Sequence, residues 1–178
     1  PRGMQPLPSG WLDSHPGQTA LRQLVDLLAH ERTQQTGAWA IKDPRSSLLL
    51  PLWRAACAEL ELPLQLVLAV RNPAEVVVSL VQRDQTSTGM DAWRAQRLWW
   101  HHNRQVLIEG EDLPLQVVSY SHWFQPSTAR QQLRQLQPQL SAEQIEAALS
   151  CVRIEHRRSH RQTPSIPIAQ PLQQLQQR

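Results

Sequence analysis

The stretch LQLVLAVRNPAEVVVS, residues 64–79, contains the strongest structural signal in the chain. Its first seven residues, 64–70, are apolar except for Gln65, a pattern typical of a strand covered on both faces in a parallel sheet. Pro73 favours the start of a helix, because its missing N–H is not needed in the first turn, and it disfavours helical geometry at Asn72. We therefore expect a buried parallel strand, a short turn and a helix with Asn72 as its N-cap.

Arg71 lies between the predicted strand and the predicted helix. The free N–H groups and the dipole of a helix N-terminus attract an anion, and the planar guanidinium can bind phosphate through two hydrogen bonds. Ser79, about two turns later, can present a hydroxyl from the same helix face. The alternative is an arginine that caps the sheet edge and a serine that faces a neighbouring strand, and spacing alone leaves both open.

Outward from this stretch, hydrophobic periodicity and turn residues predict further elements. Helices are expected over 19–34, about 46–60, 73–85 and 91–109, with others beginning at Pro126 and at the capping box Ser141-Ala142-Glu143-Gln144, and strands over 38–42, 64–70 and 115–118. Strands that alternate with helices predict an α/β fold, a parallel sheet flanked by helices. Core positions are expected at Leu49, Leu50, Trp53 and Cys57. Trp93, Trp99 and Trp100 are expected in the core rather than as a shelf for an adenine ring, and His101 and His102 are expected to form a surface pair.

The composition bounds the class of protein. A chain of 178 residues can bury one substantial core without a second domain, and its net charge of +3 fits small anionic ligands as easily as nucleic acid. We expect an extended leader over 1–17, one domain over 18–162 and a Pro/Gln-rich tail over 163–178. Cys57 and Cys151 are interpreted as buried thiols of a reducing compartment. With no membrane-length apolar stretch and no signal peptide, a cytoplasmic protein is expected.

A second charged motif, Lys42-Asp43-Pro44-Arg45, follows the predicted strand over 38–42. It should therefore emerge at the carboxyl edge of the sheet, where open α/β sheets bind ligands. A lysine there places a compact positive charge beside a transferring group. For Asp43 and Arg45, an N-cap and a salt bridge are an equal alternative. For Lys42 the functional interpretation is favoured, because Arg71 would leave the sheet at the same edge.

The order and spacing of Lys42, Arg71, Pro73 and Ser79 resemble the sulfotransferases that use 3'-phosphoadenosine 5'-phosphosulfate (PAPS). In that family one strand ends in a lysine, often followed by Asp-Pro. A second strand about thirty residues later ends in Arg-x-Pro, with a serine eight residues after the arginine. The resemblance covers roughly residues 20–160.

Two further segments resemble bacterial members of this family. The segment LWWHHN, residues 98–103, is similar to their Leu-Trp-x-x-Tyr-Asn helix, with His102 where tyrosine is usual. The sequence Val118-Ser119-Tyr120 is similar to the end of their Val-Arg-Tyr-Glu-Asp-Leu strand. The residues after Tyr120 depart from the usual acidic pair.

The resemblance implies a P-loop-type sulfotransferase fold and transfer of a sulfuryl group from PAPS to an acceptor hydroxyl, with a saccharide as the expected acceptor. It implies that Arg71 and Ser79 hold the 3'-phosphate, that Tyr120 contributes to the nucleotide site, and that Lys42 stabilises the leaving oxygen. Asp43 is a candidate base only if no upstream carboxylate serves. No metal is expected, since the histidines lack the spacing of a ligand set.

The family's 5'-phosphosulfate loop, of the Gly-x-x-Arg-Ser-Gly-Thr type, has no counterpart here, and Pro8-Ser9-Gly10 is only a superficial echo. We therefore expect this chain to be the C-terminal part of a longer enzyme and to be inactive alone. The alternatives are a non-catalytic nucleotide-binding module and a P-loop kinase-like phosphotransferase, which would need a Walker loop and a metal-binding acid. The basic residues between Arg153 and Arg161 are either a solvated face or an attractor of nucleotide or anionic saccharide. No nucleic-acid partner is expected.

Overall fold

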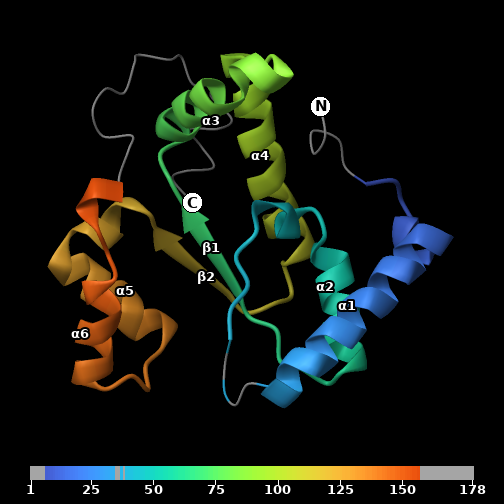
Figure 1. Ribbon diagram of the computed structural model, residues 1–178, viewed down its shortest axis with the longest axis horizontal. Helices are drawn as coiled ribbons and strands as arrows, with labels where there is room; N and C mark the ends of the chain where they lie inside the picture. Colours follow the sequence, from blue (N-terminus) through green and yellow to red (C-terminus); the bar gives the residue numbers. More distant parts are fainter. Residues whose placement is uncertain (1–6, 35–36, 38, 157–178) are drawn as a thin grey trace. The chain divides into compact units, whose positions relative to one another are not determined.

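The computed structural model describes residues 7–34, 37 and 39–156, and Figure 1 shows the arrangement of their elements. The helices are α1 (His15–Gln34), α2 (Leu50–Glu59), α3 (Pro73–Thr88), α4 (Ala92–Glu109), α5 (Pro126–Leu136) and α6 (Ala142–Ser150). Short 3-10 helices are η1 (Trp11–Asp13), η2 (Pro44–Ser47), η3 (Ser121–Phe124) and η4 (Ile154–His156), and the strands are β1 (Leu66–Val70) and β2 (Leu115–Ser119). The two strands pair in parallel, so the fold is mixed α/β, mostly helical, with a small parallel sheet.

The chain divides into two compact units. Unit 1 contains the chain up to Leu66 together with the segment from Trp100 to Pro114, and unit 2 contains Val67–Trp99 and the chain from Leu115 onward. The division therefore falls within β1 and within α4. Each unit is described by itself below.

Unit 1 is built on the packing of α1 against α2. Leu28 and Ala56 are almost completely buried, and Leu21, Leu24, Trp39, Trp53 and Leu60 are among the partly buried side chains around them. Helix α1 begins at His15, inside the predicted leader, because Ser14 Oγ accepts a hydrogen bond from Gly17 N (3.2 Å) and Pro16 suits a first turn. The helix expected from residue 46 is instead η2 followed by α2.

The strand expected over 38–42 is wrong for the residues that the structure describes. Residues 39–43 have no regular secondary structure, and Ala38 lies outside the described residues. Ile41 is 49% exposed, so the short apolar pattern has no second face to bury against. Asp43 then adopts an extended conformation as the N-cap of η2. Lys42 therefore does not follow a strand.

Unit 2 confirms the two helix starts that capping residues predicted, whereas α3 continues to Thr88, beyond the end expected at residue 85. Asn72 Oδ1 accepts a hydrogen bond from Ala74 N (2.9 Å), which makes Asn72 the N-cap of α3. Gly89, in the left-handed region at φ 65°, ends that helix. Both hydrogen bonds of the capping box between Ser141 and Gln144 are present at the start of α6. The core includes Val77, Ala95, Val118, Ala129 and Ile145.

The sheet differs from the expected strand covered on both faces. Exposure alternates along β1, where Val67 is 52% exposed, and Val117 on β2 is 59% exposed. Two strands leave one face open, and the buried face belongs to residues such as Val118. At the end of β2, the buried side-chain amide of Gln132 on α5 accepts from Ser119 N (2.5 Å) and donates to Ser119 O (3.2 Å). This amide satisfies strand groups that a third strand would otherwise pair.

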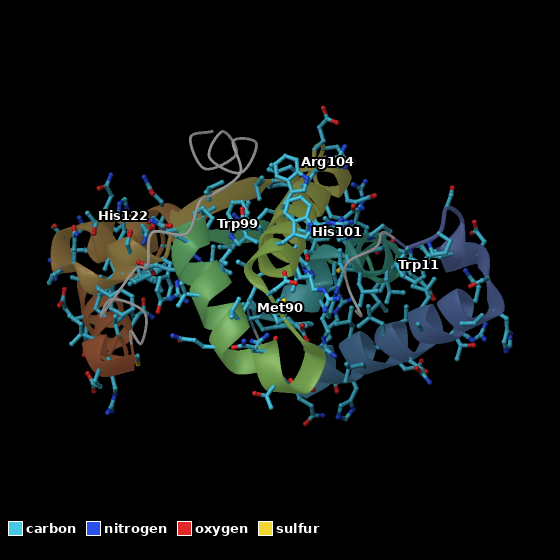
Figure 2. All side chains as sticks on the ribbon, turned by 90° about the horizontal axis from the view of Figure 1, so that it is seen from above. Trp11, Met90, Trp99, His101, Arg104 and His122 are labelled. Carbon is cyan, nitrogen blue, oxygen red and sulfur yellow. The ribbon has the colours of Figure 1, made fainter. Side chains whose placement is uncertain are left out.

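Other core predictions are confirmed in part. Leu50, Cys57 and Trp99 (labelled in Figure 2) are buried, whereas Trp93 is 63% exposed. Both cysteines are free, but Cys151, expected to be buried, is exposed where α6 ends. The predicted tail over 163–178 and the basic residues from Arg157 to Arg161 lie outside the described residues.

Candidate functional site

Arg71 in unit 2 lies directly after β1 and directly before the N-cap of α3. Its side chain is 23% exposed, and its Nε donates a hydrogen bond to Glu75 Oε2 at 3.0 Å. Glu75 is in the first turn of α3, where the helix dipole stabilises a carboxylate. The predicted anion position is thus built as expected from a strand end and a helix start, with a carboxylate beside it.

Tyr120 directly follows β2 and lies beside Arg71, which directly follows β1. Its backbone N donates to Val70 O (2.8 Å), which continues the parallel pairing to the carboxyl ends of both strands. The guanidinium carbon of Arg71 lies 4.7 Å from the centroid of the Tyr120 ring, within the range of a cation–π interaction. Phe124 packs edge-on against that ring at 5.1 Å between centroids. The structure therefore joins Arg71 and Tyr120.

Ser79 lies on α3 and is exposed. Glu75 lies in the first turn of α3, between Ser79 and Arg71, which precedes the helix. Glu75 was not predicted as a site residue. Its signal was present, because an acid four residues after an arginine is a common helix pair.

In unit 1, Asp43 and Arg45 form the N-cap and the salt bridge that were the alternative to a functional role. Asp43 accepts from Arg45 N (2.8 Å) and from Arg45 Nε (3.0 Å) and Nη2 (2.5 Å), and it caps η2. These hydrogen bonds, first that of the Arg45 side chain, lower the pKa of Asp43 to about 2. A carboxylate with such a pKa accepts a proton only weakly near neutral pH, which counts against the predicted role of Asp43 as a base. Lys42 precedes this pair and is exposed.

His102 on α4 contacts the same turn and was missed as a site residue. Its Nδ1 lies 2.6 Å from Ser47 Oγ and 2.9 Å from Pro44 O, and Ser47 Oγ donates to Pro44 O at 2.7 Å. Burial, together with the neighbouring His101 (labelled in Figure 2), lowers the pKa of His102, which favours a neutral ring. Both histidines were expected on the surface, but the structure shows that both are only partly exposed. The sequence did contain a signal for His102 as a site residue, because it stands where the Leu-Trp-x-x-Tyr-Asn helix of the similar family has a tyrosine.

The predicted site residues therefore form two groups, one in each unit. Lys42 and Asp43 belong to unit 1, with Ser47 and His102. Arg71, Ser79 and Tyr120 belong to unit 2, with Glu75.

Within the described part of the chain, no cluster of three or more histidine, cysteine, aspartate or glutamate side chains has an arrangement that could hold a metal ion. The helices described there include none with the length and apolar character needed to cross a bilayer. Comparison with models of protein families, with curated proteins and with solved structures gave no match to this chain.

Proposed function

We propose that this chain carries the 3'-phosphate-binding part of a PAPS-dependent sulfotransferase, which transfers a sulfuryl group to an acceptor hydroxyl, with a saccharide as acceptor. The observation that supports this proposal best is the position of Arg71. It follows a parallel strand, precedes the capped N-terminus of α3 and packs over Tyr120 from the end of the neighbouring strand. Ligands of α/β proteins commonly bind at such a carboxyl edge.

The chemistry of this position suits a phosphate that is held without reacting. The guanidinium offers a planar set of donors, and the helix N-terminus adds a favourable dipole. Packing over Tyr120 restricts the arginine side chain, so less conformational entropy is lost when an anion binds. Ser79 adds a hydroxyl on the same helix. Glu75 opposes binding by its negative charge, so a phosphate must compete with it for Arg71.

The proposed reaction breaks the bond between sulfur and the bridging oxygen of PAPS and forms a bond between sulfur and the acceptor oxygen. The electron pair of the broken bond stays on the bridging oxygen, which leaves as part of adenosine 3',5'-bisphosphate, and the acceptor proton passes to a base. By analogy with phosphoryl transfer, catalysis is mostly positioning and charge stabilisation. The resemblance assigns stabilisation of the leaving oxygen to Lys42 and binding of the 3'-phosphate to Arg71 and Ser79.

Calorimetry on the 178-residue chain tests the proposal with three nucleotides. Adenosine 3',5'-bisphosphate should bind at least roughly tenfold more tightly than adenosine 5'-monophosphate, the scale of one charge-assisted hydrogen bond. Adenosine 2',5'-bisphosphate carries the same charges with one phosphate displaced, so it controls for simple charge attraction and should bind less tightly than the 3',5' isomer. Equal affinities for the 3',5'-bisphosphate and the monophosphate would overturn the assignment.

A further inference from the structure

Three groups from two distant segments meet at His102. Pro44 O and Ser47 Oγ come from η2, and the imidazole comes from α4, 58 positions after Pro44. The three distances, 2.6, 2.7 and 2.9 Å, are all within hydrogen-bonding range. The contact lies within unit 1.

The hydrogen-bond roles follow from the donors available. Ser47 has one hydroxyl proton and donates it to Pro44 O. If Nδ1 of His102 carried no proton, its lone pair would face the carbonyl oxygen at 2.9 Å, which is repulsive. With the proton on Nδ1, the ring donates to Pro44 O and Ser47 Oγ, and both oxygens have lone pairs to accept it. The complementary arrangement is therefore the Nδ1–H form of a neutral ring.

Side-chain hydrogen bonds of His102 connect the turn to α4. The backbone hydrogen bonds of the turn, such as Ser46 N to Asp43 O and Leu48 N to Arg45 O (both 3.0 Å), stay within it. The pair of Asp43 and Arg45 is also internal. The imidazole of His102 adds a tie from outside the turn, to the residue that begins η2 and to the residue that ends it.

We propose that His102 is a positioning residue for Lys42: by holding Pro44 O and Ser47 Oγ it fixes the turn on which Lys42 is presented. Lys42 is two residues from Pro44, whose ring restricts the backbone between them. A lysine side chain is long and flexible, so a fixed backbone is what limits the volume its ammonium explores. The inference rests on the proposed function for the ligand that Lys42 meets, namely the 5' side of the nucleotide.

The tie itself can be tested without a ligand, by amide hydrogen exchange on the 178-residue chain. His102→Ala should raise the exchange rates at Ser46 and Leu48 by roughly two- to tenfold, the scale of a lost hydrogen bond. His102→Asn places an amide N–H where Nδ1–H was and should keep both rates near those of the unchanged chain. His30→Ala, at an exposed histidine of α1, is the control and should leave the rates unchanged. Unchanged rates in His102→Ala would overturn the inference.

The role toward Lys42 is tested by nucleotide affinity in a double-mutant cycle. His102→Ala should weaken adenosine 3',5'-bisphosphate by roughly two- to tenfold, and His102→Asn should restore the affinity. In a Lys42→Ala background the same substitution should have no further effect, because the group it positions is gone. Adenosine 3'-monophosphate lacks the 5' group, so its affinity should not respond to His102→Ala.

The outcomes separate the two proposals. Loss of affinity in both backgrounds, or an equal loss for the 3'-monophosphate, contradicts positioning of Lys42 and leaves a general stabilising role. If the unchanged chain binds none of these nucleotides, the proposed function fails, and positioning of Lys42 for a nucleotide fails with it. The exchange rates then still decide whether His102 holds the turn.

Discussion

The groups around Arg71 and around Lys42 are held in place by different means. Arg71 stands between β1 and α3, and its neighbours in sequence provide the N-cap and the first helical turn. Lys42 stands in a segment without regular secondary structure, and the turn after it is tied to a histidine 58 positions away from Pro44. One position is set mainly by local residues, and the other needs a long-range contact.

This difference has a practical consequence for substitutions. The placement of Arg71 should tolerate changes on distant elements, apart from Tyr120, as long as the strand and the helix form. The turn beside Lys42 should respond to a change on α4.

Arg71→Ala should weaken adenosine 3',5'-bisphosphate by about 1.5–3 kcal/mol, because a charge-assisted hydrogen bond to the 3'-phosphate is lost. The melting temperature should change little if the arginine serves the ligand rather than the fold. Calorimetry and thermal unfolding measure the two quantities. Arg83→Ala is a matched control, since Arg83 is an exposed arginine of α3 that pairs with Asp84. A large loss of stability with unchanged affinity would favour the arginine as a structural cap.

Asn72→Ala should lower the free energy of unfolding by about 1 kcal/mol, because Ala74 N loses its side-chain acceptor. Asn72→Ser retains a capping oxygen and should recover most of the loss. Denaturant unfolding monitored by circular dichroism compares the variants. Equal losses in the two variants would show that the cap contributes little and that the local account of this region is incomplete.

Glu75→Gln should strengthen binding of the bisphosphate by about 0.5–1 kcal/mol, since it removes a negative charge beside Arg71. The neutral amide keeps an oxygen that can accept from Arg71 Nε, so the side chain of Arg71 stays oriented. The gain should shrink at high salt, as expected for an electrostatic effect. Weaker binding in Glu75→Gln would instead mean that the charge of Glu75 is needed to hold Arg71 in place.

The stability of the turn should depend on pH through His102. Its pKa in the fold lies below the ordinary value of 6.5, chiefly because the ring is buried. As the pH falls below about 6.5, the unfolded chain binds the proton before the folded chain does, so stability decreases until the pH passes the lower folded pKa. The nearby Asp43, with a pKa of about 2, and Arg45, whose pKa is raised by its hydrogen bonds to Asp43, keep their charge over this range.

Unfolding experiments between pH 5 and pH 7.5 measure this dependence. His102→Asn has no titrating ring and should lose that part of the pH dependence while keeping the tie to the turn. The pH dependence that remains in His102→Asn reports on the other titrating groups of the chain. An identical pH dependence in both proteins would contradict a buried neutral His102.

Much of the architecture around Arg71 was predictable because its signals are local. Pro73 and Asn72 specify where α3 begins, the apolar run specifies β1, and Ser141 with Gln144 specifies the start of α6. The pairing of Arg71 with Tyr120 was not predicted, although both were assigned to the same site. It depends on the parallel register of two strands that are separated by α3 and α4 in the chain.

The incorrect predictions for the strand over 38–42, for Trp93 and for His102 have a common cause: a local pattern does not show what packs against it. The segment at residues 39–43 carries a strand-like pattern, but a strand forms only where a partner supplies hydrogen bonds, and none pairs with it among the described residues. Trp93 fits the helical period of α4 but faces solvent, because periodicity gives a face and not its partner. His102 was expected at the surface for the same reason.

The sequence alone specifies where α3, α5 and α6 begin, since caps and prolines act over a few residues. It also placed Arg71 between a strand and a helix. Tertiary packing set the contacts between segments that are distant in the chain: Tyr120 beside Arg71, and His102 beside Pro44 and Ser47. The physical reason is that hydrogen bonds and electrostatic shifts depend on distances of a few ångströms, which packing sets and spacing along the chain does not.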